Sequence, residues 1–426
     1  NQRISHNSMK LLTLATACLY LVTTSSASAH TKPHEDDQLY IYRSAASSGA
    51  AKASLSSKNF ATVGRYKSTP EGYPSFGYGM SGVSFDVTPN PDTSSSEFTL
   101  YITLSLPNVD PWYKMYSKSK DGCRFAVFRD GERVGEDIVI TPDDEDPVRK
   151  VTLSSNSNSG SGSKSVKVQV LRISEDVYSK GDGNGVVFRG VTADGATLST
   201  PAPPTLTAHF VGDSDTAGFG IHSHPNDPHC LFPKQLWSKI SDASLSWASQ
   251  LGKLMGAEVT LTAISGVGVD GEYGLSPWTT YMDRALPYDD SAEGVWEYSA
   301  HESPDFVFVL IGPNDCGMTH SKSCPDDWES NYVSLLNHYR HVYGNKPKLV
   351  SVIGGSGSGY NDSLLSATQD AIDAFVDGGG EATLVKVSKE VWDSVNDGGS
   401  NGNNGCMGHY NEKGHGMVAN DLFKTL

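Results

Sequence analysis

The stretch "HFVGDSDTAGFG", residues 209–220, places a serine between two aspartates directly after a short apolar run. These residues alone allow two interpretations. Asp and Ser often bond their own backbone in an ordinary strand-to-loop turn. Alternatively, Ser214 is a nucleophile held at the end of a rigid strand. The pattern of the chain on either side bears on the choice.

Beyond this stretch, apolar runs typical of buried strands alternate with helical patterns. The runs are "LTAHFVG", "VTLTAISG", "DFVFVLIG", "KLVSVIGG" and "ATLVKVS". Large side chains around 328–342 recur at spacings of three and four, which places them on one helix face: Trp328, Tyr332, Leu335, Leu336, Tyr339 and Val342. The final residues predict another helix, with Val418, Leu422 and Leu426 aligned. This alternation predicts a parallel sheet covered by helices on both faces, at residues 205–426.

The chain before this region has the pattern of an all-β domain. "FTLYITLSL" alternates apolar and polar residues with the period of a half-buried strand, and "SVKVQVLRI" repeats that period. Asp130-Gly131 lies between two such runs, which is typical of a hairpin turn. We therefore predict a β-sandwich over residues 38–200. "STPAPPT", residues 199–205, is the predicted linker.

Length and charge limit the classes of partner. A chain of 426 residues suggests two domains of ordinary size. Its 49 Asp and Glu against 33 Lys and Arg give a net charge of −16. Such a surface repels nucleic acid and anionic membranes, so we predict neither as a partner. The sequence leaves the oligomeric state open.

Residues 9–29, "MKLLTLATACLYLVTTSSASA", have a Lys, an apolar core and a small-residue end, which predicts a secretory signal peptide and an extracellular protein. The apolar run is too short for a membrane anchor. Without that segment five cysteines remain, an odd number, so one is left without a cysteine partner. Cys316 and Cys324 are the favoured bridge because they are close in sequence, and the other pairing is open.

Four separated features point to chemistry at one edge of the sheet. Ser214 follows the first strand of the parallel region, Gly266 follows the second in "AISGVG", and Asn314 follows the third in "LIGPND". His409 lies in "GCMGHYNEKGH", before the last helix. Ligands of parallel sheets bind at the carboxyl ends of the strands. Acyl transfer needs a nucleophile, a base and donors for an oxyanion, and these residue types supply all of them.

These four blocks, in this order, resemble those of the SGNH (or GDSL) hydrolases, and the chain is most similar to carbohydrate esterase family 2. "AISGVGVDGEYG" and "PDFVFVLIGPND" are similar to the second and third blocks, and "VQVLRISEDVYSKGDGNGVVFRGVTADGATLSTP" resembles the passage from that family's jelly-roll domain into its catalytic domain. The resemblance covers nearly the whole mature chain. It implies a jelly-roll domain followed by a three-layer α/β/α hydrolase domain.

By this resemblance Ser214 is the nucleophile and His409 the general base. The N–H groups of Ser214 and Gly266 and the Asn314 amide form the oxyanion hole. The implied activity is a secreted serine esterase that removes O-acetyl groups from plant-type polysaccharides such as xylan or glucomannan, through an acyl-enzyme and without a cofactor. The alternatives are an SGNH lipase or lysophospholipase and a carbohydrate-binding protein without catalysis.

The chain departs from the family pattern near the site. Asp215 stands where an apolar residue is usual, Pro313 replaces a threonine, and Cys406 takes the place of the Asp that usually precedes the histidine by three residues. The third member of a catalytic triad is therefore either the Asp215 carboxylate or a backbone carbonyl, and we expect the carbonyl. His415 competes with His409, which is favoured because a base at the entrance of a helix can reach a strand end.

Other motifs have weaker support. "GGSNG" around Ser400 matches a nucleophile elbow, but no strand pattern precedes it. His222, His224 and His229 lack carboxylates or cysteines at metal-ligand spacing, so we predict no metal. The aromatic rings of Tyr273 and Trp278 are candidates for packing against a sugar. The alternative for both is ordinary packing under a long loop.

Overall fold

The structure is a computed structural model that describes residues 53–54, 60–90, 97–106, 122–141, 148–154, 165–175, 185–223, 237–270, 277–317, 323–356, 362–396 and 403–426. Residues Ala50–Leu426 form one compact unit. Within the ranges given, no helix has the length and apolar character needed to cross a membrane. The predicted signal peptide, Tyr273 and Ser400 lie outside the described residues.

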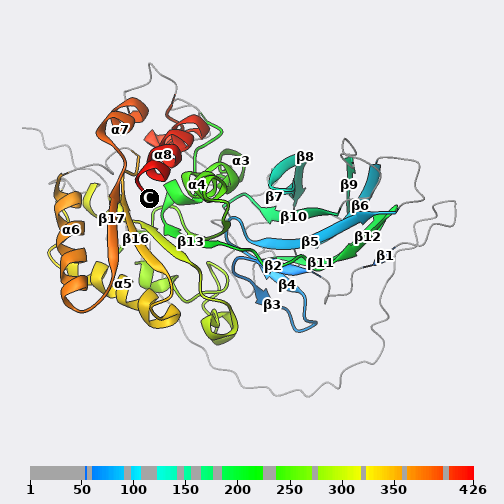
Figure 1. Cartoon of the computed structure of the whole chain (residues 1–426), viewed down its shortest axis with the longest axis horizontal. Coiled ribbons are helices and arrows are strands. Elements are labelled where there is room, and N and C mark those ends of the chain that lie inside the picture. Colours follow the sequence, from blue (N-terminus) through cyan, green and yellow to red (C-terminus); the bar gives the residue numbers. More distant parts are fainter. Residues whose placement is uncertain are drawn as a thin grey trace, which may run out of the picture. The chain divides into compact units, whose positions relative to one another are not determined.

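Two antiparallel sheets form the predicted β-sandwich (Figure 1). The first has the order β3-β4-β11-β6-β9, with β1 beside β11, and its strands are β1 (Ala53–Ser54), β3 (Lys67–Ser68), β4 (Pro74–Phe76), β6 (Glu97–Ser105), β9 (Val148–Ser154) and β11 (Val186–Asp194). The second has the order β12-β5-β10-β7-β8, with β2 beside β5, and its strands are β2 (Ala61–Val63), β5 (Gly82–Pro89), β7 (Cys123–Arg129), β8 (Glu132–Ile140), β10 (Val166–Arg172) and β12 (Ala196–Ser199).

The period of two in the sequence explains how the sandwich is filled. In β6, Phe98, Leu100, Ile102 and Leu104 are buried while their neighbours are partly exposed. These side chains join one apolar cluster with residues of both sheets. The predicted hairpin is confirmed, since Arg129 pairs with Glu132 across Asp130-Gly131. Both turn residues have positive φ, 51° and 83°, as tight hairpin turns require.

The five predicted apolar runs form one parallel sheet of order β14-β13-β15-β16-β17. Its strands are β13 (Thr207–Gly212), β14 (Glu258–Ala263), β15 (Phe306–Leu310), β16 (Lys348–Ile353) and β17 (Ala382–Lys386). Alternate side chains of these strands enter two separate apolar clusters. Phe210 belongs to one and Val211 to the other, so both faces of the sheet are covered.

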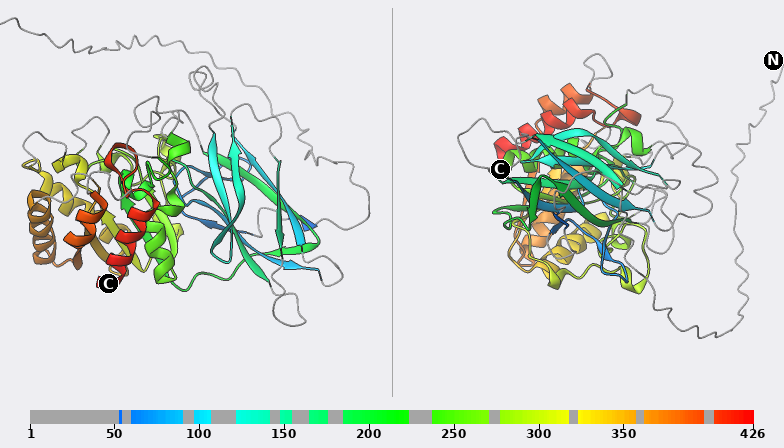
Figure 2. Two further views of the ribbon diagram at one scale, coloured as in Figure 1. Left: turned by 90° about the horizontal axis from the view of Figure 1, so that it is seen from above. Right: turned by 90° about the vertical axis from the view of Figure 1, so that its right-hand side faces the viewer.

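Helices from different parts of the chain cover the two faces. One cluster contains residues of α4 (Trp247–Met255), α7 (Lys389–Asn396) and α8 (Glu412–Thr425), and the other contains residues of α5 (Trp328–Tyr343) and α6 (Asp362–Asp377). In the right-hand view of Figure 2, the red α8 and the yellow α5 lie on opposite sides of the molecule, and the two clusters place them on opposite faces of the parallel sheet. The predicted three-layer α/β/α arrangement is confirmed.

The predicted helix faces are largely confirmed. Trp328, Tyr332, Leu335, Leu336 and Tyr339 of α5 are buried, and Val342 is partly buried against them. In α8, Val418 and Leu422 are buried. The expectation for Leu426 is wrong, because this residue lies beyond the end of α8 and is 51% exposed.

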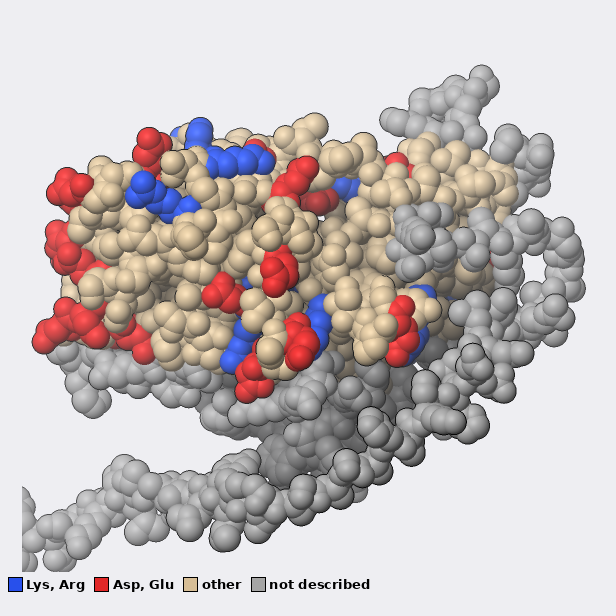
Figure 3. Space-filling model, turned by 90° about the horizontal axis from the view of Figure 1, so that it is seen from below, with Lys and Arg blue, Asp and Glu red and all other residues tan. Residues whose placement is uncertain are grey.

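The surface reflects the acidic composition. On the face shown in Figure 3, acidic side chains gather at the end occupied by α6, and basic side chains lie among acidic ones over the rest. Asp370, Asp373 and Asp377 of α6 are exposed.

A buried carboxylate joins the sandwich to the parallel-sheet region. Asp242 is fully buried and accepts hydrogen bonds from Arg133 Nη1 of β8 at 2.7 Å and from His222 Nε2 at 3.1 Å. Burial by itself would raise the pKa of Asp242, but the bond from His222 and the charge of Arg133 outweigh it, and the pKa lies below its usual value. Beside it, the Ala243 N–H donates to the Ile173 carbonyl across the same junction at 2.8 Å.

We predict that Asp242→Asn lowers the free energy of unfolding at pH 7 by about 2 kcal/mol or more, because hydrogen bonds to a buried charged group are lost. Urea unfolding measures this. Because its folded pKa is depressed, Asp242 stabilises the fold above about pH 4, and the contribution disappears as pH falls through the folded pKa. The control is Glu258→Gln, which breaks the partly exposed Lys167–Glu258 pair and should cost less than about 1 kcal/mol. Equal losses of unfolding free energy in the two variants would contradict the role of Asp242 in joining the two regions.

Candidate active site

The pairing of three neighbouring strands brings the predicted residues to one edge of the sheet. Gly212 at the end of β13 is in register with Ala263 of β14 and with Leu310 of β15. Ser214, Gly266 and Asn314 follow these strand ends within a few residues. Residues up to 100 positions apart in the chain are thereby placed beside one another only because β13 lies between its two partners.

The turn after β13 fixes Ser214 as the first residue of a short helix, α2 (Ser214–Ala217). The Asp213 side chain caps this helix by accepting the Asp215 N–H at 3.1 Å. Gly212 is required here, since a Cβ on it would lie 2.2 Å from Thr216 Oγ1 and 2.6 Å from the Leu310 carbonyl oxygen. As the first helical residue, Ser214 has a backbone N–H without an acceptor inside the helix, which leaves it available to a ligand.

Ser214 and His409 are in direct contact. The Ser214 Oγ lies 2.7 Å from His409 Nε2. His409 Nδ1 lies 2.9 Å from the Cys406 carbonyl oxygen, which can only accept, so the Nδ1 carries the proton and Nε2 accepts from the serine hydroxyl. The Phe219 ring packs edge-on against the imidazole, with centroids 4.8 Å apart. The pair therefore has the arrangement of a nucleophile and its base.

The group that orients His409 is a backbone carbonyl. Cys406 is disulfide-bonded and fully buried, and its N–H donates to Ser223 Oγ at 2.9 Å. Gly220 allows the close approach of this segment, since a Cβ on it would lie 2.8 Å from the Cys406 Cβ. The carbonyl that accepts from His409 thus belongs to a residue held through both its side chain and its backbone.

Both carboxylate oxygens of Asp215 bond Ser356 rather than His409. Asp215 is 2% exposed, so it is not a solvated loop charge. Its Oδ1 accepts from Ser356 Oγ and its Oδ2 from the Ser356 N–H, both at 2.7 Å. Ser356 follows β16, so this carboxylate ties α2 to a further strand end. That orientation agrees with the expectation that a carbonyl, and not Asp215, assists the base.

Asn314 connects two of the strand ends. Its Nδ2 donates to the Val267 carbonyl at 3.0 Å and has a longer contact of 3.4 Å with Asp213 Oδ2. Burial raises the pKa of Asp213 well above its usual range, and the nearby charge of Asp215 adds to the effect. Gly266 has a φ of 80°, a backbone conformation that favours glycine.

One residue of the site was missed in the sequence. Asp315 is 1% exposed and accepts the Val269 and Asp270 N–H groups at 2.9 and 3.0 Å. It fixes the loop that carries Gly266, and Gly268 makes room for it, because a Cβ there would lie 2.2 Å from Asp315 Oδ1. Its position directly after Asn314 in "GPND" was the available signal.

The remaining candidates have other surroundings. Trp278 lies in the turn Trp278–Thr280 and is 1% exposed, so its ring packs inside the protein and cannot stack on a sugar, contrary to the substrate-binding hypothesis. His415 is fully buried in α8, and its Nδ1 accepts the Trp247 N–H at 3.1 Å, so it is not directed at Ser214. Among the described residues no group of three potential metal ligands occurs, and His224 and His229 lie outside them.

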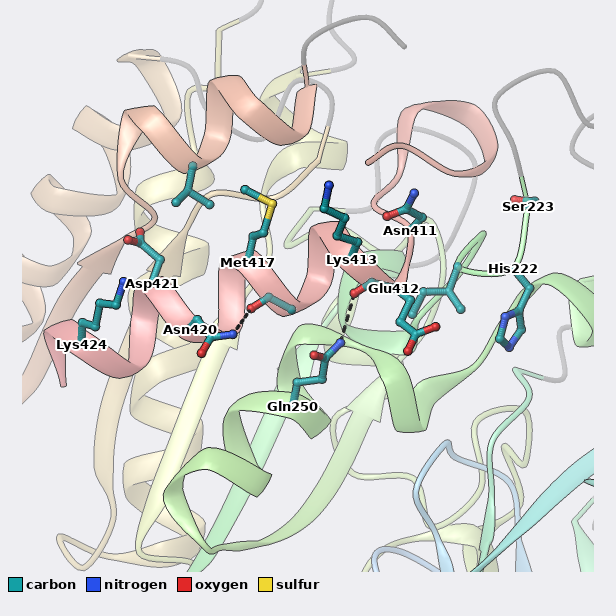
Figure 4. Close-up of a pocket in the computed structure, with 13 residues that line it drawn as sticks. His222, Ser223, Gln250, Asn411, Glu412, Lys413, Met417, Asn420, Asp421 and Lys424 are labelled. Atoms are coloured by element: carbon teal, nitrogen blue, oxygen red, sulfur yellow. Dashed lines mark hydrogen bonds between the residues drawn. The ribbon is translucent and has the colours of Figure 1, made fainter. Parts of the chain in front are cut away.

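A groove of about 870 Å³ runs beside α8 (Figure 4). Gln250 of α4 and Lys413, Met417 and Lys424 of α8 contribute to its lining, and it reaches Ser223 at one end. Neither Ser214 nor His409 lines this groove. The site of the Ser–His pair is therefore a different one.

Comparisons with known proteins agree with this architecture. No family model matches the chain. Over 150 residues it is 26% identical to "Cellulase/esterase CelE" of Acetivibrio thermocellus, a match that covers 35% of this chain and only 17% of that protein. A family two carbohydrate esterase from Clostridium thermocellum, solved in complex with cellohexaose, superposes with a TM-score of 0.62 at 18% identity over 86% of this chain and 97% of its own.

Two further solved structures are similar over most of their length. The family two carbohydrate esterase from Cellvibrio japonicus has a TM-score of 0.62 at 17% identity, covering 88% of this chain and 96% of that one. The acetyl xylan esterase Est2A from Butyrivibrio proteoclasticus has a TM-score of 0.63 at 15% identity, covering 88% and 97%. The fold is thus that of an SGNH (GDSL) hydrolase preceded by a β-sandwich. More narrowly, the chain has the fold of the family 2 carbohydrate esterases.

We predict that His415 makes the fold sensitive to acid. Burial lowers its pKa to about 4, whereas the unfolded chain binds this proton near pH 6.5. Above pH 6.5 His415 is neutral in both the folded and the unfolded chain, so its lowered pKa does not affect stability there. As pH decreases from 6.5 towards about 4, the unfolded chain binds the proton and the folded chain does not, so the free energy of unfolding falls. Between pH 7 and pH 5 the loss from His415 is about 2 kcal/mol.

Urea unfolding of the wild type and of His415→Gln at the two pH values measures this difference. His209, also buried with a lowered pKa, acts in the same direction in both proteins, so only the difference between them counts. His341→Gln, at an exposed position, is the control and should retain the wild-type pH dependence. An unchanged pH dependence in His415→Gln would contradict the prediction.

Proposed function

We propose that this protein is a serine esterase that removes O-acetyl groups from polysaccharides through an acyl-enzyme. The observation that carries the proposal is the 2.7 Å contact between Ser214 Oγ and His409 Nε2, at the edge of the sheet where Gly266 and Asn314 also lie. The fold shared with family 2 carbohydrate esterases supports it.

The reaction follows from this arrangement. His409 Nε2 takes the proton of the Ser214 hydroxyl as the oxygen attacks the carbonyl carbon of the acetyl ester. The negative charge formed on the carbonyl oxygen is met by the N–H groups of Ser214 and Gly266 and by the Asn314 amide. The imidazolium returns the proton to the departing sugar oxygen, and water then attacks the acetyl-serine by the same route, releasing acetate. The Cys406 carbonyl keeps the Nδ1 proton in place throughout.

The substrate class that we propose is acetylated plant-type polysaccharide such as xylan or glucomannan. Its support is the similarity to an acetyl xylan esterase and to an esterase solved with cellohexaose. We also propose that the protein is secreted, on the basis of the signal-like residues 9–29. A strong preference for long acyl chains over acetyl in p-nitrophenyl esters would instead favour a lipase.

We predict that Ser214→Ala and His409→Ala abolish acetyl release to a similar extent, because residues that act as one unit are not additive. Asn314→Ala should lower kcat by roughly 10²–10³-fold, the usual cost of one oxyanion donor. Acetate release from acetylated xylan, together with circular dichroism to verify the fold, is the measurement. Near-wild-type turnover by folded Ser214→Ala would reject the serine mechanism, and a change confined to KM in Asn314→Ala would assign that residue to binding.

A separate prediction concerns Asp215. Asp215→Asn should change kcat by no more than about threefold and leave the pH profile in place, because the base is assisted by the Cys406 carbonyl. The variant should instead be less stable by about 1–3 kcal/mol, since the bonds to Ser356 are weakened. Ser356→Ala, which removes one of these bonds from the other side, is the matched control. A large loss of kcat with a shifted acidic limb would show that Asp215 acts on His409.

A further inference from the structure

The loop that carries Gly266 is held by a side chain of the β-sandwich. Glu175 follows β10 and is 9% exposed. Its Oε1 accepts the Ser265 N–H and its Oε2 accepts from Ser265 Oγ, each at 2.5 Å. Ser265 itself is 4% exposed. One carboxylate therefore fixes both the backbone and the side chain of the residue directly before Gly266.

This contact bears on the orientation of the Gly266 N–H. The peptide unit that contains this N–H begins at Ser265, so fixing Ser265 restricts the direction of the donor. On the far side of Gly266, Asn314 Nδ2 bonds the Val267 carbonyl, and Asp315 binds the next N–H groups. Gly266 has a φ of 80° and is intrinsically free to adopt many conformations. Without an anchor on each side, its N–H would not be held in one direction.

Glu175 is itself rigidly placed. The Arg124 N–H donates to Ser174 Oγ at 2.9 Å, and Arg172, fully buried, donates from Nε to the Ser174 carbonyl at 3.1 Å. A cavity of about 10 Å³, room for roughly one water, lies between Glu175 and Ala217 of the nucleophile helix. The carboxylate is largely shielded from bulk water, and charge-assisted hydrogen bonds are stronger in such surroundings than in water.

We propose that Glu175 is a positioning residue for the oxyanion hole. Through it, the β-sandwich helps to set the geometry of the active site. This inference rests on the proposed esterase function. It assigns to Glu175 no contact with the substrate, since the residue acts through Ser265 and the Gly266 N–H. The expected signature is a loss of kcat without a matching loss of substrate affinity, because the donor is needed mainly in the transition state.

The test uses the full chain with p-nitrophenyl acetate. We expect Glu175→Gln to lower kcat about 10-fold and Glu175→Ala about 100-fold, with KM within about twofold of the wild type, since a misplaced donor costs up to about 10²-fold. Ser265→Ala removes the hydroxyl bond but keeps the backbone bond, and should lower kcat less than Glu175→Ala. Lys67→Met is the control. It breaks the Lys67–Asp289 contact between the sandwich and the loop at 277–301, and should leave kcat within about twofold.

Hydrogen–deuterium exchange supplies a readout that is independent of turnover. In Glu175→Gln, amide exchange should become faster at residues 264–267 and stay unchanged in β13 and β15. Wild-type kcat together with unchanged exchange in this variant would overturn the proposal, as would an equal loss of kcat in Lys67→Met. If the wild type hydrolyses no ester, the proposed function fails, and the exchange measurement still decides whether Glu175 holds the loop. If neither Glu175 variant folds, Ser265→Ala decides by the same two measurements.

Discussion

The parallel pairing of β13 with β14 on one side and β15 on the other is the constraint on which the site depends. It sets three strand ends at the same level, so that a serine, a glycine and an asparagine from distant parts of the chain face one region. The sheet contributes side chains to an apolar cluster on each of its faces, and helices cover both faces, which leaves the strand ends as the place where polar groups can gather. Gly212, where a Cβ would overlap Thr216 and the Leu310 carbonyl, shows how closely the turn that carries Ser214 is packed against the neighbouring strand.

His409, the proposed base, is oriented by a neutral group. A carboxylate beside an imidazole stabilises the imidazolium by charge, whereas the Cys406 carbonyl supplies only a dipole, which fixes the tautomer and the ring direction. The chain nevertheless has buried carboxylates nearby, and it uses them for backbone geometry. Asp213 caps α2, Asp215 binds Ser356, Asp315 holds the loop after β14, and Glu175 holds Ser265. Their shared role is to set the direction of N–H donors and strand ends.

The sequence was most informative where a pattern repeats. The alternation in β6, the Asp130-Gly131 turn and the five apolar runs each have one dominant period, so the fold class and the strand ends that carry Ser214, Gly266 and Asn314 could be predicted. The family blocks added His409. Contacts between residues far apart in the chain leave no such pattern. Nothing in the sequence relates Glu175 to Ser265, or Asp215 to Ser356. The sequence also does not distinguish an aromatic residue that packs in a core, such as Trp278, from one that contacts a sugar.

The bond between Ser214 and His409 joins positions 195 residues apart in the chain. Contacts of such long range form only after the intervening chain has been brought together, because the entropy of closing the large loop must be offset by other interactions first. Here the intervening chain includes four of the five parallel strands and helices of both layers. We therefore expect the pair to be among the parts of the molecule that are completed late in folding. A partly folded chain with most of its sheet in place would still lack the contact between Ser214 and His409.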